Sequence, residues 1–405
     1  MTDKIYLTKE GLAAFYSDRV EALSAEIRQL KKNNVTYIMA ELFSFGIAIV
    51  AAVVYCVRDF SPQWLMAAFA MLAVYAVVRN ADVKNARRID RRVRLRTVYE
   101  RELMYQRGDF SCFGGGSRYK DPQHAFTFDM DVFGHDSLYN RINRTVTTGG
   151  GDTLAQWLGG MLPDRAAVKR RREAVSELAG MEQWRSAFLA LGVNVAAGGD
   201  SDDGKIDSNG ILRAVRDIGN KRIAPKAGGK LALAVAVAAI VCFIALIVLA
   251  VAGVVPATLA VLWGVVQMFV AIGLNSKSIH DISRAVEKMH AQMQAYIGLL
   301  GHISKADYSA VELKELQAAL TGGDGGALAS FGRLSEILKS LDRRGNFIGL
   351  ILFNMFALSD FFLVRRFLKW QHDYMGCVGE WVDCVSRMDA LVSMAVFRFN
   401  EPGAV

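Results

Sequence analysis

Acidic and imidazole side chains gather between His124 and Asp136, the first place where this sequence offers chemistry. Asp129 and Asp131 stand two apart in the run 126–133, whose alternating apolar residues predict a β-strand. On a strand both carboxylates would face one side, where a pair can hold a magnesium ion or share a proton. In the other interpretation, these side chains cap helices and accept hydrogen bonds from loop amides before Gly134. We favour this structural role and assign no metal ligand.

Elsewhere the sequence contains no complete motif for phosphate binding, for a catalytic nucleophile or for calcium binding. The glycine-rich segment 147–153 lacks the lysine and hydroxyl residue of a phosphate loop, and Ser137 belongs to no GxSxG elbow. The segment 198–210 misses the calcium-loop spacing, because Gly210 stands where the bidentate glutamate belongs. Three histidines lack acidic support at metal-ligand spacing: His280, His290 and His302. We therefore predict no catalytic, cofactor-binding or metal-binding residue, and no enzyme activity for this chain.

Composition indicates a basic membrane protein. The 405 residues suffice for two or three domains, and 52% of them are hydrophobic. The net charge of +8 suits nucleic acid, anionic lipid or the basic cytoplasmic loops of a membrane protein. Five cysteines form no CxxC pair, so neither a disulfide framework nor a zinc site is expected. The N-terminus has no signal-peptide hydrophobic region.

Two pairs of apolar runs are expected to position the polar segments of the chain. The segment 36–79 contains apolar runs at 37–57 and 64–78, joined by a short turn, and we predict a transmembrane hairpin. A buried hairpin in a soluble protein is the alternative for this pair. The segment 226–275 repeats the arrangement with runs at 231–251 and 257–274. Basic residues flank both hairpins on the side of the long loops, so the termini and the bulk should be cytoplasmic, at the inner membrane.

The segments before and after the first hairpin are polar. Residues 1–35 contain an amphipathic helix at 8–33, which either packs on the body of the protein or forms a coiled-coil dimer contact. Residues 80–120 form a basic juxtamembrane segment followed by a glycine-rich loop. Its cations either fix the topology, bind anionic lipid headgroups, or contact nucleic acid, and we favour the first role.

Residues 276–405 carry helical periodicity almost throughout. The apolar run 346–364 contains Asn354 and Asp360, and a polar group at bilayer depth needs a partner. We expect a buried helix in which Asp360 binds a basic neighbour, with a fifth spanning helix as the alternative. The residues from Trp370 to Val396 predict one long helix.

One stretch of about sixty residues resembles a known family. It contains Ser137-Leu138, Asn143-Arg144-Thr145-Val146-Thr147, Gly150, Leu154, Trp157-Leu158, Pro163 and the run RREAVSEL at 171–178. This order resembles the start of the core (lever) domain of the MutS mismatch-repair family. The preceding DPQHAFTFDMDVFG, residues 121–134, is similar to the membrane-bound MutS-related branch. Within this segment, Gly149 to Gly151 and Pro163-Asp164 should separate the helices.

The resemblance implies a mainly α-helical integral membrane protein. Residues 121–225 would form the start of a cytoplasmic MutS-like core, and 276–405 its lever continuation. DNA binding, a homodimer, and ATP with magnesium on an ATPase domain are implied by the family alone. No GxxxxGK[ST] motif occurs in the sequence, so that ATPase domain is absent from these residues, and the chain resembles one that stops at a domain boundary. The alternative is a non-enzymatic membrane scaffold with a MutS-like core that does not bind DNA; membrane lipids are partners in both.

Overall fold

The structure is a computed structural model that describes residues 8–58, 60–160, 164–193, 204–220, 229–322, 326–343, 347–401 and 403. These residues are mainly α-helical, as predicted, and the pairing of extended backbone within them is confined to a bridge between Thr147 and Ile206. The chain divides into two compact units. Unit 1 comprises Met1–Arg144, Leu178–Gly204 and Met394–Val405, and unit 2 comprises Thr145–Glu177 and Lys205–Ser393.

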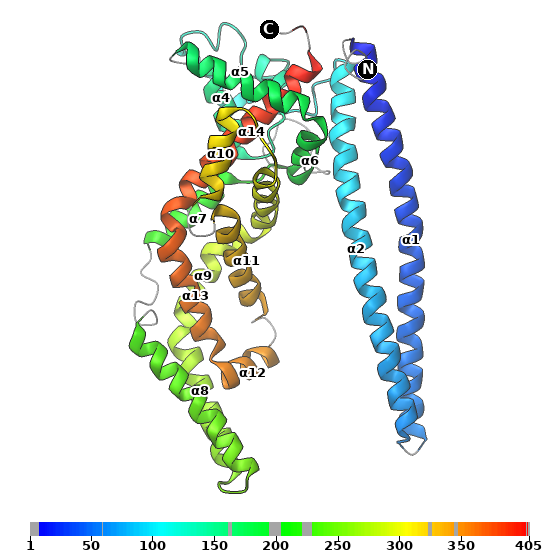
Figure 1. Cartoon of the computed structure of the whole chain (residues 1–405), viewed down its shortest axis with the longest axis vertical. Coiled ribbons are helices and arrows are strands. Elements are labelled where there is room, and N and C mark those ends of the chain that lie inside the picture. Colours follow the sequence, from blue (N-terminus) through cyan, green and yellow to red (C-terminus); the bar gives the residue numbers. More distant parts are fainter. Residues whose placement is uncertain are drawn as a thin grey trace. The chain divides into compact units, whose positions relative to one another are not determined.

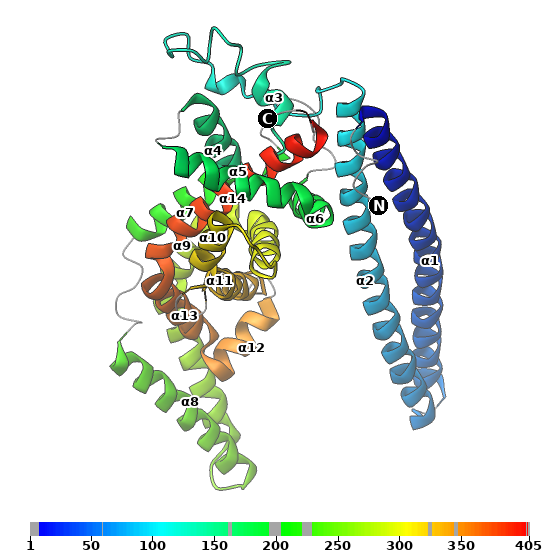
Figure 2. The ribbon, with the colours of Figure 1, turned by 45° about the horizontal axis from the view of Figure 1, so that its top comes forward.

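Unit 1 is built on a long antiparallel helical hairpin (Figures 1 and 2). Helix α1 spans Lys9–Val57 and begins where the Thr8 hydroxyl accepts a hydrogen bond from the amide of Gly11. Helix α2 spans Pro62–Gln106, with proline in the first turn, where its missing N–H costs nothing. The amphipathic helix expected at 8–33 is therefore continuous with the first apolar run, because no proline or glycine interrupts the chain between them.

The core of unit 1 lies at the polar end of this hairpin. Tyr16, Leu23 and Tyr99 form a buried cluster, and Phe399 packs against it. The smaller elements of the unit are η2 at Ser117–Tyr119, α3 at Leu138–Ile142, α6 at Glu182–Gly192 and the end of α14, Val378–Asn400. The loop expected around 111–120 is confirmed, with η2 as a single turn inside it.

Unit 2 is a helical bundle arranged around α9, Ala257–Ser304. Helices α7, α8, α10, α11, α12 and α13 all contact α9. The unit also contains α14 as far as Ser393. Its other elements are α4 (Thr148–Gly159), α5 (Arg165–Gly180), α7 (Ser208–Asn220), α8 (Lys230–Val251), α10 (Val311–Thr321), α11 (Gly326–Arg343), α12 (Phe347–Ala357), α13 (Ser359–Tyr374) and η4 (Met375–Cys377). In Figure 2, α8 and the first part of α9 form an antiparallel hairpin that extends from the rest of this bundle.

The strand predicted at 126–133 is wrong. The segment folds into consecutive turns in which the amide of Met130 donates to the carbonyl of Phe126, at 3.0 Å, and that of Val132 donates to Thr127, at 3.0 Å. Asp131 takes a left-handed φ of 47°, which an extended strand excludes. A segment of alternating apolar residues forms a sheet only beside a neighbouring strand. Here the backbone hydrogen bonds are made within the segment instead.

Two helix boundaries also differ from expectation. The glycines 149–151 form the first turn of α4 and do not separate helices. The helix predicted from Trp370 to Val396 is interrupted, because α13 ends at Tyr374 and the turn η4 precedes α14. Pro163 and most of the segment 198–210, where other breaks and a rejected calcium loop were considered, lie outside the described residues.

Candidate functional site

The acidic loop around Asp129 does not form the paired-carboxylate arrangement that a strand would have given. Asp129 and Asp131 are both exposed on turns, and the His124 Nδ1 accepts hydrogen bonds from the amides of Phe126 and Thr127 at 3.4 and 3.3 Å. The described part of the chain contains no group of three His, Cys, Asp or Glu side chains suited to a metal ion. His124 thus has the local backbone-binding role that we favoured for this loop.

The most constrained polar site of unit 2 is a buried carboxylate. Asp389 of α14 is fully buried and accepts hydrogen bonds from the amides of Val146 (3.1 Å) and Thr147 (2.9 Å). It also accepts one from the hydroxyl of Thr147, at 2.7 Å. That hydroxyl in turn accepts from the amide of Gly150, at 2.9 Å, which caps α4. Asp389 therefore holds the segment that starts α4. We call this arrangement the carboxylate lock.

The glycines of α4 are required by this lock. A Cβ atom on Gly150 would lie 2.1 Å from the Asp389 Oδ2, and one on Gly149 would lie 2.3 Å from the Ser386 Oγ. Both distances are far inside van der Waals contact, so the first turn of α4 can approach α14 this closely only without side chains. This close approach explains why Gly149 and Gly150 lie inside a helix.

Hydrogen bonds connect the lock to α9. The amide of Ser208, at the start of α7, donates to the Thr148 hydroxyl at 3.0 Å. The Ser208 hydroxyl lies 3.3 Å from the hydroxyl of Tyr296, a fully buried residue of α9. Nearby, the Lys205 ammonium donates to the Thr145 hydroxyl at 3.0 Å. Helices α4, α7, α9 and α14 therefore meet at one hydrogen-bonded site.

Burial sets the charge state of the lock. Desolvation raises the pKa of Asp389 to about 6, although the hydrogen bonds from Thr147 and Val146 and the charge of Lys205 oppose this shift. The carboxyl group is therefore a titratable group whose pKa lies close to neutral pH. Asp389 was not among the residues predicted from the sequence, where its one signal is an acidic residue on the apolar face of a helix.

Unit 1 contains a separate buried ion pair. Arg144 and Glu102 lie 3.1 Å apart with almost no exposed side-chain area. Asn400 donates its Nδ2 to Glu102 at 2.6 Å and accepts from the Tyr16 hydroxyl at 2.7 Å. The Arg144 guanidinium also stacks on Phe113, 3.8 Å from the ring centroid. Arg144 is thus a structural tie between α2, α14 and the loop before α4.

Four helices of the described chain are long and apolar enough to cross a membrane, as the two predicted hairpins require: α1, α2, α8 and the Ala257–Ser283 part of α9. Helix α8 has 22 residues, or about 33 Å, which matches a hydrocarbon core of about 30 Å. Its large apolar side chains face outward, with Leu231 at 79% and Val251 at 86% exposure. Such exposure is costly in water and favourable in lipid, so these helices indicate membrane association.

Cations collect where the first hairpin becomes polar. Asn85 of α2 donates to the Leu30 carbonyl of α1 at 3.0 Å, and Arg92 pairs with Glu26 at 3.0 Å. These two contacts hold α1 and α2 in register. Seven exposed basic residues at this level form no ion pair within the described ranges: Arg28, Lys31, Lys32, Lys84, Arg87, Arg88 and Arg91. We call them the basic collar. They begin within two or three helical turns of the apolar runs.

No family model, no curated protein and no solved structure gives a significant match to this chain.

The apolar run 346–364 forms two helices that meet at a break beside α8 and α9. Leu358 takes a left-handed φ of 48° between α12 and α13. Asn354 is fully buried, donates to the Leu350 carbonyl at 3.0 Å and accepts from the amide of Asp360 at 3.0 Å. With 11 and 16 residues, or about 17 and 24 Å, neither helix has the length of a spanning helix. The single buried helix and the fifth spanning helix are both replaced by this broken pair.

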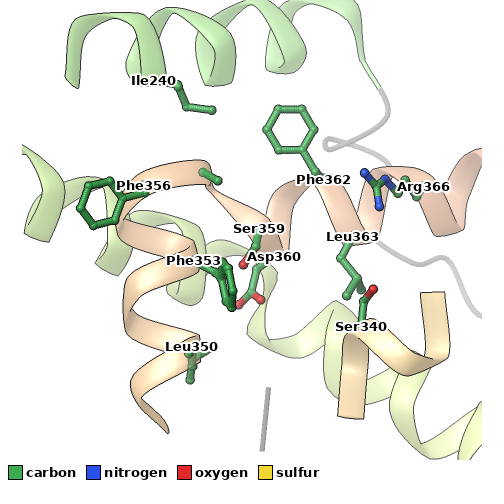
Figure 3. Close-up of a pocket in the computed structure, with 12 residues that line it drawn as sticks. Ile240, Ser340, Leu350, Phe353, Phe356, Ser359, Asp360, Phe362, Leu363 and Arg366 are labelled. Carbon is green, nitrogen blue, oxygen red and sulfur yellow. The ribbon is translucent and has the colours of Figure 1, made fainter. Parts of the chain in front are cut away.

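Two cavities lie beside the break. One of about 450 Å³ is lined by residues of α8, α11, α12 and α13, which Figure 3 shows converging around Phe353, Asp360 and Phe362. The other, of about 550 Å³, lies between α13 and the start of α8. The described residues thus contain the carboxylate lock, a buried ion pair, the basic collar and two cavities beside the apolar hairpin of α8 and α9.

Proposed function

We propose that this chain is the membrane-anchored helical module of a MutS-related protein. In this proposal the two hairpins hold the chain in the cytoplasmic (inner) membrane, and the bundle of unit 2 acts as a core and lever on the cytoplasmic side. DNA is the proposed partner, and ATP with magnesium belongs to an ATPase domain that these 405 residues do not include. In this proposal the chain itself binds DNA and transmits movement.

The observation that carries this proposal is the continuity of α9. Its first part, Ala257–Ser283, is apolar enough to span the membrane, and the same helix continues to Ser304. Tyr296 in its second part contacts Ser208 beside the carboxylate lock. One continuous helix thus joins a membrane segment to the family-like TVTTGGG segment, as a lever requires, and movement at one end has a route to the other.

A basic helix of unit 2 supplies a surface for the phosphates of DNA. Helix α5 carries five basic residues between Arg165 and Arg172, and Arg165 and Arg172 are both exposed. Arg170 lies 3.7 Å from Glu315 and Arg171 lies 3.9 Å from Glu312, so these two anchor the helix to α10. Clustered exposed cations on one helix are the electrostatic feature that binds duplex phosphates.

DNA binding by the chain in lipid nanodiscs tests the proposal. We expect binding that weakens steeply with salt, with a slope of log K against log salt of about −3 for a handful of phosphate contacts. The R165Q/R172Q variant should reduce this slope by about 2, and R87Q/R88Q in the basic collar serves as the charge-matched control. Absence of DNA binding at low salt would refute the DNA-binding function.

The scaffold function is the second candidate, and the basic collar favours it. The seven exposed cations of the collar, which form no ion pair with any described residue, suit topology and lipid contact. DNA has poor steric access beside a bilayer. In that case neither the wild-type chain nor either charge variant should retain DNA at low salt, and of the two variants only R87Q/R88Q should weaken binding to anionic vesicles.

A further inference from the structure

The cavity between α13 and the start of α8 is cationic on one side and apolar on the other. Arg365, Arg366, Lys369 and His372 line it together with Leu233 and Phe362. None of its described lining residues is acidic. Arg366, Lys369 and His372 are exposed, and within the described residues they take part in no ion pair. The polar side of the cavity is therefore suited to an anion that approaches from solvent or from the membrane surface.

The cationic side lies at the end of a spanning helix. Arg365 donates to the carbonyl of Gly229, the residue just before α8, at 3.2 Å. Helix α8 has the length of the hydrocarbon core and starts at Lys230, so Gly229 marks the membrane boundary. Residues of α13 that follow Arg365 thus lie at the depth of lipid phosphates. Basic pockets between membrane helices are a common way to hold such headgroups.

The apolar side continues toward the interior of the membrane. Phe362 and Arg366 line both cavities, so the two are adjacent along α13. The cavity of about 450 Å³ is lined by Ile240, Phe353 and Phe356 among others. Figure 3 shows Phe362 extending toward α8 on the same side as Ile240. Ile240 is ten residues beyond Lys230, about 15 Å deeper along α8. This depth suits an acyl chain rather than a soluble ligand.

We propose that this pair of cavities holds one anionic phospholipid. Its phosphate is bound by Arg366, Lys369 and His372, and one acyl chain lies along α8 toward Phe353 and Phe356. Charge complementarity selects the occupant, since the lining of the headgroup end presents cations and no acid. The other end is lined mainly by apolar side chains, and the one acid in its lining, Asp360, is itself buried. The bound lipid would fix the α12–α13 break against α8. This inference depends on the membrane hairpin alone and stands apart from the DNA-binding proposal.

Native mass spectrometry of the whole chain in mild detergent tests the lipid site. Dioleoyl phosphatidylglycerol and dioleoyl phosphatidylcholine are added at equal concentration. We expect a single phosphatidylglycerol adduct, favoured over phosphatidylcholine at least tenfold, and no competition from glycerol 3-phosphate at the same concentration. The R366Q/K369Q variant changes two exposed residues and should lower phosphatidylglycerol binding about tenfold. The charge-matched R87Q/R88Q variant should change it less than twofold.

Three results would overturn the proposal. Equal binding of both lipids by the wild-type chain would show that headgroup charge does not select the occupant. Equal losses in R366Q/K369Q and R87Q/R88Q would show diffuse attraction to a basic protein. Displacement of the lipid by glycerol 3-phosphate would identify a site for soluble phosphate. The comparison of lipids uses the wild-type chain, so it remains decisive even if a variant fails to fold.

Discussion

Thr147 donates a 2.7 Å hydrogen bond from its hydroxyl to the carboxylate of Asp389, although 242 residues separate them in sequence. This contact brings α14 against the first turn of α4 and makes Asp389 the N-terminal partner of a glycine-rich helix. The stability of unit 2 therefore depends on one buried carboxyl group.

The Asp389→Ala variant should destabilise unit 2 strongly. It leaves the amides of Val146 and Thr147 and the Thr147 hydroxyl buried without their acceptor, and each such group costs about 1–3 kcal/mol. We expect a total loss of about 3 kcal/mol or more, measured by thermal unfolding in detergent. Asp383→Asn, an exposed acid on the same helix, is the control and should change stability by less than about 0.5 kcal/mol. Similar losses in both variants would contradict the lock.

Gly150→Ala should be destabilising despite the higher helix propensity of alanine. Its Cβ would lie 2.1 Å from the Asp389 Oδ2, so α4 and α14 would have to separate. Gly332→Ala in α11 is the matched control, because a Cβ there meets nothing within 4 Å. That control should be neutral or stabilising by up to about 1 kcal/mol. Unchanged thermal stability of Gly150→Ala would refute the close approach.

The pH dependence of stability should carry the signature of Asp389. Its pKa is raised from 3.8 to about 6 in the folded chain, so the folded state binds the proton more tightly than the unfolded state. The resulting stabilisation is complete below pH 3.8 and is lost as pH rises through about 6. Between pH 7.5 and pH 5 the wild-type chain should therefore gain melting temperature relative to Asp389→Asn. Parallel profiles for the two proteins would contradict this titration.

The Glu102–Arg144 pair should show strong coupling. Removing either partner leaves a charge buried and unpaired, so Glu102→Gln and Arg144→Met should each cost about 3–5 kcal/mol. The double variant should cost less than the sum of the single changes. Glu100→Gln is the control, because Glu100 pairs with Arg96 at a more exposed position, and it should cost less than about 0.5 kcal/mol. Additive losses would contradict a direct pair.

Native cysteines report on the membrane hairpin. Cys242 lies near the middle of α8, whereas Cys377 is exposed in η4. In nanodiscs a membrane-impermeant maleimide should label Cys377 at least tenfold faster than Cys242, and the difference should vanish in denaturing detergent. Cys112 should react slowly at pH 7.5, because burial raises the pKa of its thiol to about 11. Rapid labelling of Cys242 in nanodiscs would contradict its place in a spanning helix.

The sequence by itself determined the helical class and the four apolar segments. Both are local properties, because about twenty consecutive apolar residues form a helix long enough to cross a bilayer whatever they contact. Helix α8 is an example. The role of His124 beside local amides was also predictable, since its partners lie two and three residues away.

The tertiary structure alone decided which polar residues pair across long distances in the sequence. The pairings of Asp389 with Thr147 and of Glu102 with Arg144 depend on chain segments that meet only after folding. Glycines that signal a helix break in sequence entered α4, because close packing against α14 excludes any side chain. Helical periodicity in 346–364 likewise did not reveal the break at Leu358, where Asn354 satisfies the backbone of the next helix. The pairings of Asp389 and Glu102 follow from long-range contacts, whose free energies exceed the local preferences of the chain, whereas the bond between Asp360 and Asn354 at the break lies within one segment.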